Sequence, residues 1–149
     1  MKTVVCTIEK TEQCAAEFVK DLSASHKRRA GATVVGLSGE LGVGKTAFVQ
    51  MVAKAFGITD TVTSPTFVIE KVYRLLNQPF DCLIHIDAYR LENINELRVL
   101  GWGDIVKDPA NIIFIEWSEK VEELLPDDTI KIDFEVVGEE KRKIVIKSF

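Results

Sequence analysis

Eight consecutive residues combine the residue types that bind the phosphates of a nucleotide. Residues 39–46 read G-E-L-G-V-G-K-T. The glycines let the backbone curl so that successive N–H groups point at phosphate oxygens, and the start of a helix adds its positive end. Lys45 supplies a mobile cation, and the Thr46 hydroxyl supplies a hard oxygen ligand for Mg²⁺. We expect nucleotide contacts from Gly39, Glu40, Leu41, Gly42, Val43, Gly44, Lys45, Thr46 and Ala47.

The segments on either side of this loop have the pattern that such a site needs. The apolar run 33–38 precedes the loop and predicts a buried strand. After the loop, Phe48, Val52 and Phe56 recur at helical spacing. Strand, loop and helix in this order disfavour the alternative, a glycine turn with an exposed lysine.

Two carboxylates end apolar runs and are candidates for the metal and water chemistry. Asp87 follows the run 83–86, and Glu116 follows the run 112–115. Ligands bind at the carboxyl ends of strands in α/β sheets, although an acid at a strand end is often only a turn residue. One carboxylate could hold Mg²⁺ and the other could orient an attacking water. The residues alone leave the assignment open.

Four further features near these acids have both a functional and an ordinary interpretation. His85, inside an apolar strand, is typical of a hydrogen-bonded core residue. Arg90 could stabilise transition-state charge or pair with a nearby acid. Trp117 could stack on a base, but a strand-end tryptophan usually packs. The polar segment 63–67 is either a loop into a strand or a nucleotide sensor of the kind found in other phosphate-loop proteins.

The remaining patterns predict one domain over residues 1–149 with an α/β fold. Turn residues at 77–79 place two strands at hairpin distance, so part of the sheet should be antiparallel. We expect a three-layer sandwich like that of phosphate-loop NTPases, with a mixed, mainly parallel sheet and a carboxyl-terminal β-hairpin. Strands are expected at 4–8, 33–38, 66–75, 81–87, 111–116, 129–136 and 143–146, and helices at 12–25, 45–55 and 92–100.

Composition limits the possible partners and compartments. The net charge of −4 argues against a general electrostatic grip on nucleic acid. The basic triplets 27–29 and 141–143 are short and typical of solvated helix ends or turns. Three cysteines without C-x-x-C spacing lie in apolar stretches, which favours reduced core thiols in a cytoplasmic protein. No apolar run is long enough to span a bilayer, so no membrane association is expected.

Five segments together resemble a known family. They are the phosphate loop, S-P-T-F at 64–67, H-x-D-x-Y-R-L at 85–91, E-x-x-x-L-G at 96–101 and I-E-W at 115–117. In order and spacing they resemble the bacterial tRNA threonylcarbamoyladenosine biosynthesis ATPase family (TsaE, formerly YjeE), over nearly the whole chain. Glu40, Val43 and Ala88 depart from the usual aspartate, alanine and leucine. None of these departures removes a phosphate or metal ligand.

The resemblance implies a Mg²⁺-dependent ATPase that is weak alone and stimulated by a partner heterodimer similar to TsaB and TsaD. That complex modifies the adenosine beside the anticodon of tRNAs reading codons that begin with A. The chain itself would bind ATP and Mg²⁺, meet tRNA only through the complex, and be a monomer when alone.

The resemblance also implies roles for individual residues. Lys45 and Thr46 correspond to the phosphate and Mg²⁺ ligands, with Lys45 also acting in catalysis. Glu116 corresponds to a metal-site carboxylate, and Asp87 to the catalytic or Walker B acid. Thr66 corresponds to a switch residue, and Thr11 lies where the amino-terminal segment approaches adenine.

Other nucleotide-binding classes fit the sequence less well. A small phosphate-loop kinase phosphorylating a small molecule is the enzyme alternative, but no arginine cluster for a lid lies between the acids and the tail. A GTPase is disfavoured because the chain has no N-K-x-D signature. A nucleotide-gated assembly factor, in which bound ATP sets the shape, overlaps with the family role.

Overall fold

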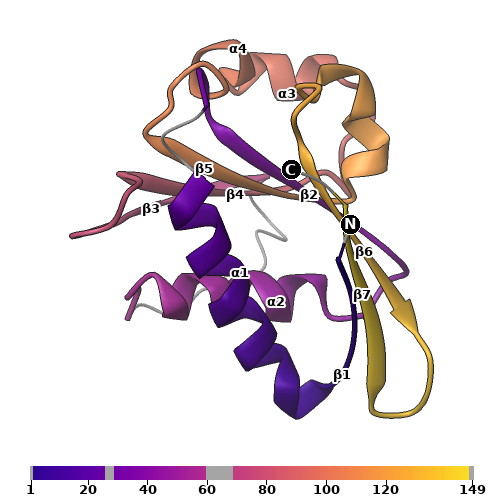
Figure 1. Ribbon diagram of the computed structural model, residues 1–149. Coiled ribbons are helices and arrows are strands. Elements are labelled where there is room, and N and C mark those ends of the chain that lie inside the picture. The colour runs from indigo at the N-terminus through magenta and orange to yellow at the C-terminus, as the bar shows by residue number, and fades with distance from the viewer. Residues whose placement is uncertain (1, 26–28, 60–68, 148–149) are drawn as a thin grey trace.

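The computed structural model of the chain describes residues 2–25, 29–59 and 69–147 (Figure 1). A seven-stranded sheet has the order β1-β7-β6-β2-β5-β4-β3. Its strands are β1 (Lys2–Thr7), β2 (Thr33–Ser38), β3 (Glu70–Arg74), β4 (Cys82–Asp87), β5 (Asn111–Glu116), β6 (Ile130–Val136) and β7 (Lys141–Lys147). The helical elements are η1 (Ile8–Lys10), α1 (Thr11–Ser25), α2 (Lys45–Ala55), α3 (Asn95–Val99), α4 (Trp102–Ile105) and η3 (Ser118–Leu124).

The sheet is mixed, with its parallel part in the centre. β6, β2, β5 and β4 pair in parallel with one another, whereas β3 pairs antiparallel to β4 and β7 antiparallel to β6. β1 then pairs antiparallel to β7, so only β7 and β3 run against the other described strands. The predicted mixed, mainly parallel sheet and the carboxyl-terminal hairpin are confirmed.

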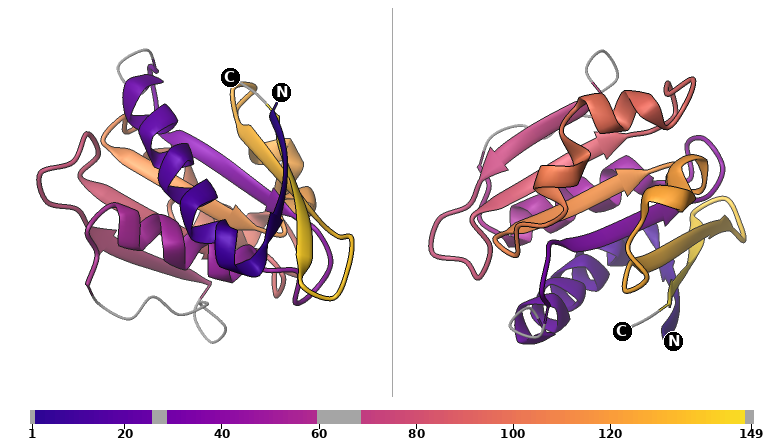
Figure 2. Two further views of the ribbon diagram at one scale, coloured as in Figure 1. Left: turned by 60° about the horizontal axis from the view of Figure 1, so that its bottom comes forward. Right: turned by 90° about the horizontal axis from the view of Figure 1, so that it is seen from above.

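Helices cover both faces of the sheet because its central strands are apolar on both sides. α1 and α2 lie on one face, and α3, α4 and η3 lie on the other (Figures 1 and 2). Successive residues of β5 alternate between the two cores. Phe114 joins Phe18 of α1 and Phe48 of α2, while Ile113 joins Trp102 on the opposite face. Fully burying a side chain of this size contributes roughly 1.5–3 kcal/mol. The three-layer α/β prediction is therefore confirmed.

The predicted helix over 92–100 is only partly correct. Before α3, the Asn93 side chain accepts a hydrogen bond from the Asn95 N–H, which holds residues 93–95 in a turn. Gly101 then adopts φ 87°, which ends α3 and starts the short helix α4 rather than stopping helical structure altogether. The expected strand at 66–75 is described from residue 69 onward, and β3 begins at Glu70.

Two of the three cysteines lie in the core. Cys6 and Cys14 are buried, Cys82 is half-buried, and all three are free. Across the described segments, none of the helices combines the length and apolar character of a membrane span.

Candidate nucleotide-binding site

The loop at 39–44 joins the carboxyl end of β2 to the first turn of α2, where a parallel sheet offers its ligand-binding edge. Two features of the backbone require glycine at position 39. Its φ of 136° is unfavourable for other residues, and a Cβ at this position would lie 2.6 Å from the carbonyl oxygen of Phe134. Gly44, with φ 110°, precedes the first residue of α2. The backbone is thus shaped to present the N–H groups at the start of α2 to an anion.

Lys45 is held at the loop by neutral groups. Its ammonium donates to the carbonyl oxygens of Gly39 and of Glu40, the latter at 3.0 Å, and lies 3.9 Å from the ring centroid of Trp117. Burial lowers the pKa of the Lys45 ammonium below its usual range, and the charges of Glu116, Glu119 and Asp87 act in the opposite direction. A phosphate oxygen is a stronger partner than a carbonyl or a ring, so Lys45 can exchange these contacts for an anion.

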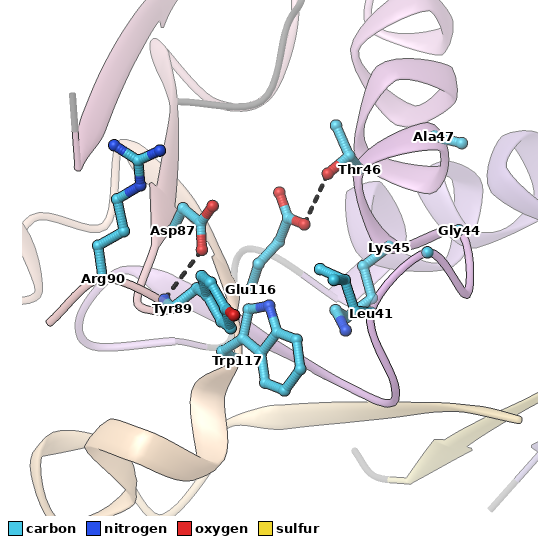
Figure 3. Close-up of a pocket in the computed structure, with 11 residues that line it drawn as sticks. Leu41, Gly44, Lys45, Thr46, Ala47, Asp87, Tyr89, Arg90, Glu116 and Trp117 are labelled. Atoms are coloured by element: carbon cyan, nitrogen blue, oxygen red, sulfur yellow. Dashed lines mark hydrogen bonds between the residues drawn. The ribbon is translucent and has the colours of Figure 1, made fainter. Parts of the chain in front are cut away.

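Glu116 uses both carboxylate oxygens inside the site. Oε1 accepts a hydrogen bond from the Thr46 hydroxyl at 2.7 Å, and Oε2 lies 2.6 Å from Nε2 of His85. In Figure 3, Glu116 lies between Asp87 and Thr46. Asp87 is the direct register partner of Glu116 across β4 and β5. Both acids therefore end neighbouring parallel strands at one edge of the sheet.

Asp87 and Trp117 are anchored by the residues that follow their strands. One oxygen of Asp87 accepts a hydrogen bond from the Tyr89 N–H at 3.0 Å. The Tyr89 ring lies 5.0 Å from the Trp117 ring, between centroids. Trp117 has a left-handed backbone, φ 58°, which is uncommon for a residue with a side chain and concentrates at functional sites. This turn places the indole over Lys45.

A pocket of about 340 Å³ opens between the loop and these residues (Figure 3). We call the strand-end side of it the carboxylate wall, which consists of Asp87, Tyr89, Arg90, Glu116 and Trp117. Two acids, an arginine and two aromatic rings thus face the loop lysine and threonine. The arrangement suits a polyphosphate with a divalent cation.

A second hollow, of about 150 Å³, lies on the other side of the same loop. It shares Gly42, Gly44 and Ala47 with the first pocket. We call its other side the hairpin wall, which consists of Thr11, Met51, Phe134, Arg142 and Ile144. Apolar side chains with one hydroxyl and one guanidinium suit a flat heteroaromatic ring.

Comparison with known proteins gives the family. The sequence model of the family described as "Threonylcarbamoyl adenosine biosynthesis protein TsaE" matches residues 5–144. The chain belongs to the TsaE family. The family resemblance inferred from the sequence motifs is therefore confirmed, as is a connection with the biosynthesis of threonylcarbamoyladenosine in tRNA.

Individual relatives agree with this assignment. A Rickettsia bellii protein named as tRNA threonylcarbamoyladenosine biosynthesis protein TsaE is 34% identical over 137 residues, covering 91% of this chain and 90% of the relative. A Bacillus subtilis protein of the same name is 37% identical over 111 residues, 74% of this chain and 66% of the relative. The crystal structure of Bacillus subtilis YdiB superposes with a TM-score of 0.64 at 25% identity, covering 97% of this chain and 84% of that one.

The structure of this TsaE-family chain brings most of the sequence-predicted site residues together. Residues 41, 42 and 44–47 of the loop line the first pocket beside Asp87 and Glu116. Val43 and Thr11 line the second hollow. Thr66, with the rest of the segment 63–67, lies outside the described residues.

Thr46 and Glu116 are two residues of the site that could hold a metal ion. In the described part of the chain, no group of three or more histidine, cysteine, aspartate or glutamate side chains could hold a metal ion alone. Mg²⁺ usually takes only one or two protein oxygens and completes its shell with phosphates and waters. One hydroxyl and one carboxylate already in contact therefore fit Mg²⁺ bound together with a nucleotide.

Sequence reasoning missed the role of Arg142. The triplet 141–143 is expected as a solvated helix end or turn, but all three residues lie in β7 and Arg142 is half-buried. Arg142 lies within β7, and its Nε donates to the carbonyl oxygen of Val43 at 3.1 Å. Arg142 has the same strand parity as buried Ile144 and Ile146, so period-two alternation could have placed it on the inner face.

Proposed function

We propose that this chain binds ATP with Mg²⁺ at the phosphate loop, hydrolyses it, and is the ATPase of threonylcarbamoyladenosine formation on tRNA. The contact between the Thr46 hydroxyl and Glu116 carries the proposal. A phosphate-loop hydroxyl joined to a strand-end carboxylate is the pair that holds Mg²⁺ in phosphate-loop NTPases. The family assignment supplies the connection with tRNA.

The two proposed metal ligands and Lys45 have separate roles at the phosphates. Thr46 and Glu116 would hold Mg²⁺, which neutralises charge on the terminal phosphates when it is bound. Lys45 leaves the carbonyls of Gly39 and Glu40 and pairs with phosphate oxygens. The N–H groups at the start of α2 complete the cradle.

Asp87 is the second acid, and we assign it to the attacking water. Its register position beside Glu116 places it at the same sheet edge, while its contact with the Tyr89 N–H fixes its orientation. A carboxylate so placed can accept a hydrogen bond from water and orient it toward the terminal phosphate. The assignment leaves Glu116 with the metal and Asp87 with the water.

The hairpin wall is assigned to adenine. Thr11 and Arg142 border a hollow that is otherwise apolar and is reached from the same loop glycines. A nucleotide with its phosphates at Lys45 could extend its base into this hollow across Gly42 and Gly44. This supports the predicted place of Thr11 near the base.

We propose that the chain, a single ATPase domain and a monomer when alone, works in the cytoplasm through a heterodimer similar to TsaB and TsaD. The net charge of −4 disfavours direct capture of tRNA. Leu41 and Tyr89, which are 74% and 48% exposed at the pocket mouth, offer apolar surface to a protein partner. A partner seated there would sense the nucleotide, and Thr66 remains the predicted switch residue.

The test is phosphate release by the purified chain alone, with the partner heterodimer, and with the heterodimer plus tRNA. We expect slow release alone and strong stimulation by the heterodimer, with Lys45→Ala inactive throughout. The small-molecule kinase alternative would instead require a small acceptor for ATP turnover. Stimulation by an acceptor in place of the heterodimer would overturn the proposal.

A further inference from the structure

His85 lies inside β4 and is completely buried, yet its imidazole reaches the carboxylate wall. Nε2 is 2.6 Å from Oε2 of Glu116. Within the described residues, Nδ1 of the same ring is the one buried side-chain nitrogen or oxygen that lacks a hydrogen-bond partner. The interpretation of His85 as an ordinary, satisfied core residue is thus right about burial and wrong about satisfaction.

The two ring nitrogens of His85 have different surroundings. A contact of 2.6 Å between a ring nitrogen and a carboxylate oxygen is a hydrogen bond, and we assign Nε2 of His85 as its donor and Oε2 of Glu116 as its acceptor. Nδ1, the other ring nitrogen, has no partner, and an unpaired buried polar atom costs stability. An aliphatic side chain would fill the space without that cost. The imidazole therefore needs a reason to be there, and its contact with Glu116 supplies one.

Two hydrogen bonds from different elements fix the carboxylate of Glu116. Thr46, at the start of α2, donates to Oε1, and His85, in β4, lies against Oε2. A carboxylate held at one oxygen can still rotate about its terminal torsion, which is broad. A carboxylate held at both oxygens keeps its plane. His85 thus determines how Glu116 faces the loop.

We propose that His85 is a positioning residue that holds Glu116 in register with the Thr46 hydroxyl, so that the Mg²⁺ ligands are aligned before the metal nucleotide binds. The proposal rests on the proposed function of the site. Hydrogen-bonding partners behind a metal-ligating side chain typically change metal affinity by 10–100-fold when they are removed. We expect loss of the Nε2 donor to raise the Mg²⁺ concentration needed for nucleotide binding about tenfold or more.

Substituting His85 by glutamine or by asparagine separates the effect of the hydrogen-bond donor from the effect of a buried polar side chain. The amide nitrogen of His85→Gln can take the place of Nε2, whereas the shorter His85→Asn cannot reach Glu116 although it is equally polar. His85→Leu removes the donor and keeps an apolar side chain. Ile86→Val is the matched control, because Ile86 is a buried β4 neighbour in the opposite core.

The experiment measures ADP binding by calorimetry over a Mg²⁺ titration, with thermal unfolding of each variant. We expect His85→Gln and Ile86→Val to keep the wild-type half-saturating Mg²⁺ concentration. His85→Asn and His85→Leu should raise it while ADP binding without metal changes little. Equal Mg²⁺ dependence of the glutamine and asparagine variants would overturn the proposal.

A second measurement uses the wild-type protein without metal, so it does not depend on any variant folding. Imidazole ¹⁵N spectra of His85 should show the proton on Nε2, and a proton on Nδ1 alone would overturn the proposal. The Lys45→Ala variant distinguishes failure of the proposed function from failure of the proposed role of His85. If folded Lys45→Ala keeps wild-type, heterodimer-stimulated phosphate release, the proposed function fails. If Lys45→Ala loses that release while all His85 variants share one Mg²⁺ dependence, only the role of His85 fails.

Discussion

The carboxylate wall and the hairpin wall face the same phosphate loop but are built differently. The first comes from the carboxyl ends of β4 and β5, in the parallel centre of the sheet. The second comes largely from the antiparallel hairpin of β6 and β7, with Thr11 from the start of α1 and Met51 from α2. One wall carries two buried carboxylates, and the other is apolar apart from a hydroxyl and a guanidinium.

The difference follows from what each wall must hold. Buried carboxylates are costly unless they are paired, so they require fixed partners, and a doubly covered strand supplies fixed positions. Register puts Asp87 opposite Glu116, and His85 and Thr46 contact Glu116. A neutral base needs shape and apolar area rather than paired charge. We therefore expect the carboxylate wall to govern metal and hydrolysis, and the hairpin wall to govern affinity for the nucleoside.

The largest effect should come from the residue that serves the phosphates directly. Lys45→Ala should abolish productive ATP use, because the charge that develops on the phosphates then lacks its cation, a loss on the order of several kcal/mol. Heterodimer-stimulated phosphate release measures it. Lys54→Ala is the control, since Lys54 lies on the same helix and pairs with Glu12 in solvent. Wild-type turnover by folded Lys45→Ala would refute the assignment.

Changes in the two acids should come next and should differ from each other. Glu116→Gln and Asp87→Asn should each slow hydrolysis by about 10²-fold or more. Only Glu116→Gln should also raise the Mg²⁺ requirement, because Glu116 accepts the hydrogen bond of the Thr46 hydroxyl. Phosphate release over a Mg²⁺ titration distinguishes them, with Glu123→Gln on η3 as an exposed control. If either acid variant hydrolyses ATP normally, that acid is a turn residue.

A smaller effect is expected on the hairpin wall. Arg142→Met loses the hydrogen bond to the Val43 carbonyl and the cation beside the hollow, which should weaken ADP binding by about 1.5–3 kcal/mol. The Mg²⁺ dependence should stay as in the wild type. Lys143→Met is the control, since Lys143 pairs with Glu135 at the surface. An altered metal requirement in Arg142→Met would contradict the division between the walls.

The smallest effect should follow Thr11→Val. The hydroxyl borders the hollow and donates to the Thr7 carbonyl, so its removal should weaken ADP binding by about 0.5–1.5 kcal/mol. Calorimetry with ADP and with inorganic pyrophosphate checks the place of the contact. Pyrophosphate binding should be unchanged, and an equal loss for both ligands would remove Thr11 from the base site.

The sequence predicted the local parts of this site because their signals are local. Strand, loop and helix around Lys45 follow from one continuous segment, and Asp87 and Glu116 each follow an apolar run. The pairing of His85 with Glu116 depends on the register between β4 and β5. The residues of each strand taken alone do not show how the two strands align. The alternation that Arg142 shares with Ile144 predicts an inward-facing side chain, whereas its place in a basic triplet favours a solvated one. The helix predicted at 92–100 begins only at Asn95, after the Asn93 turn, and Gly101 starts a second short helix beyond it, so local backbone chemistry outweighs apolar spacing.

The most direct test of the account is the affinity of ADP with and without Mg²⁺, measured for the wild type, Glu116→Gln and Arg142→Met. Without metal, Glu116→Gln should bind ADP as well as the wild type or better, since a carboxylate repels phosphates, and it should lose the gain that Mg²⁺ brings. Arg142→Met should be weakened equally in both conditions. If the two variants show the same Mg²⁺ dependence, the division of work between the two walls is contradicted.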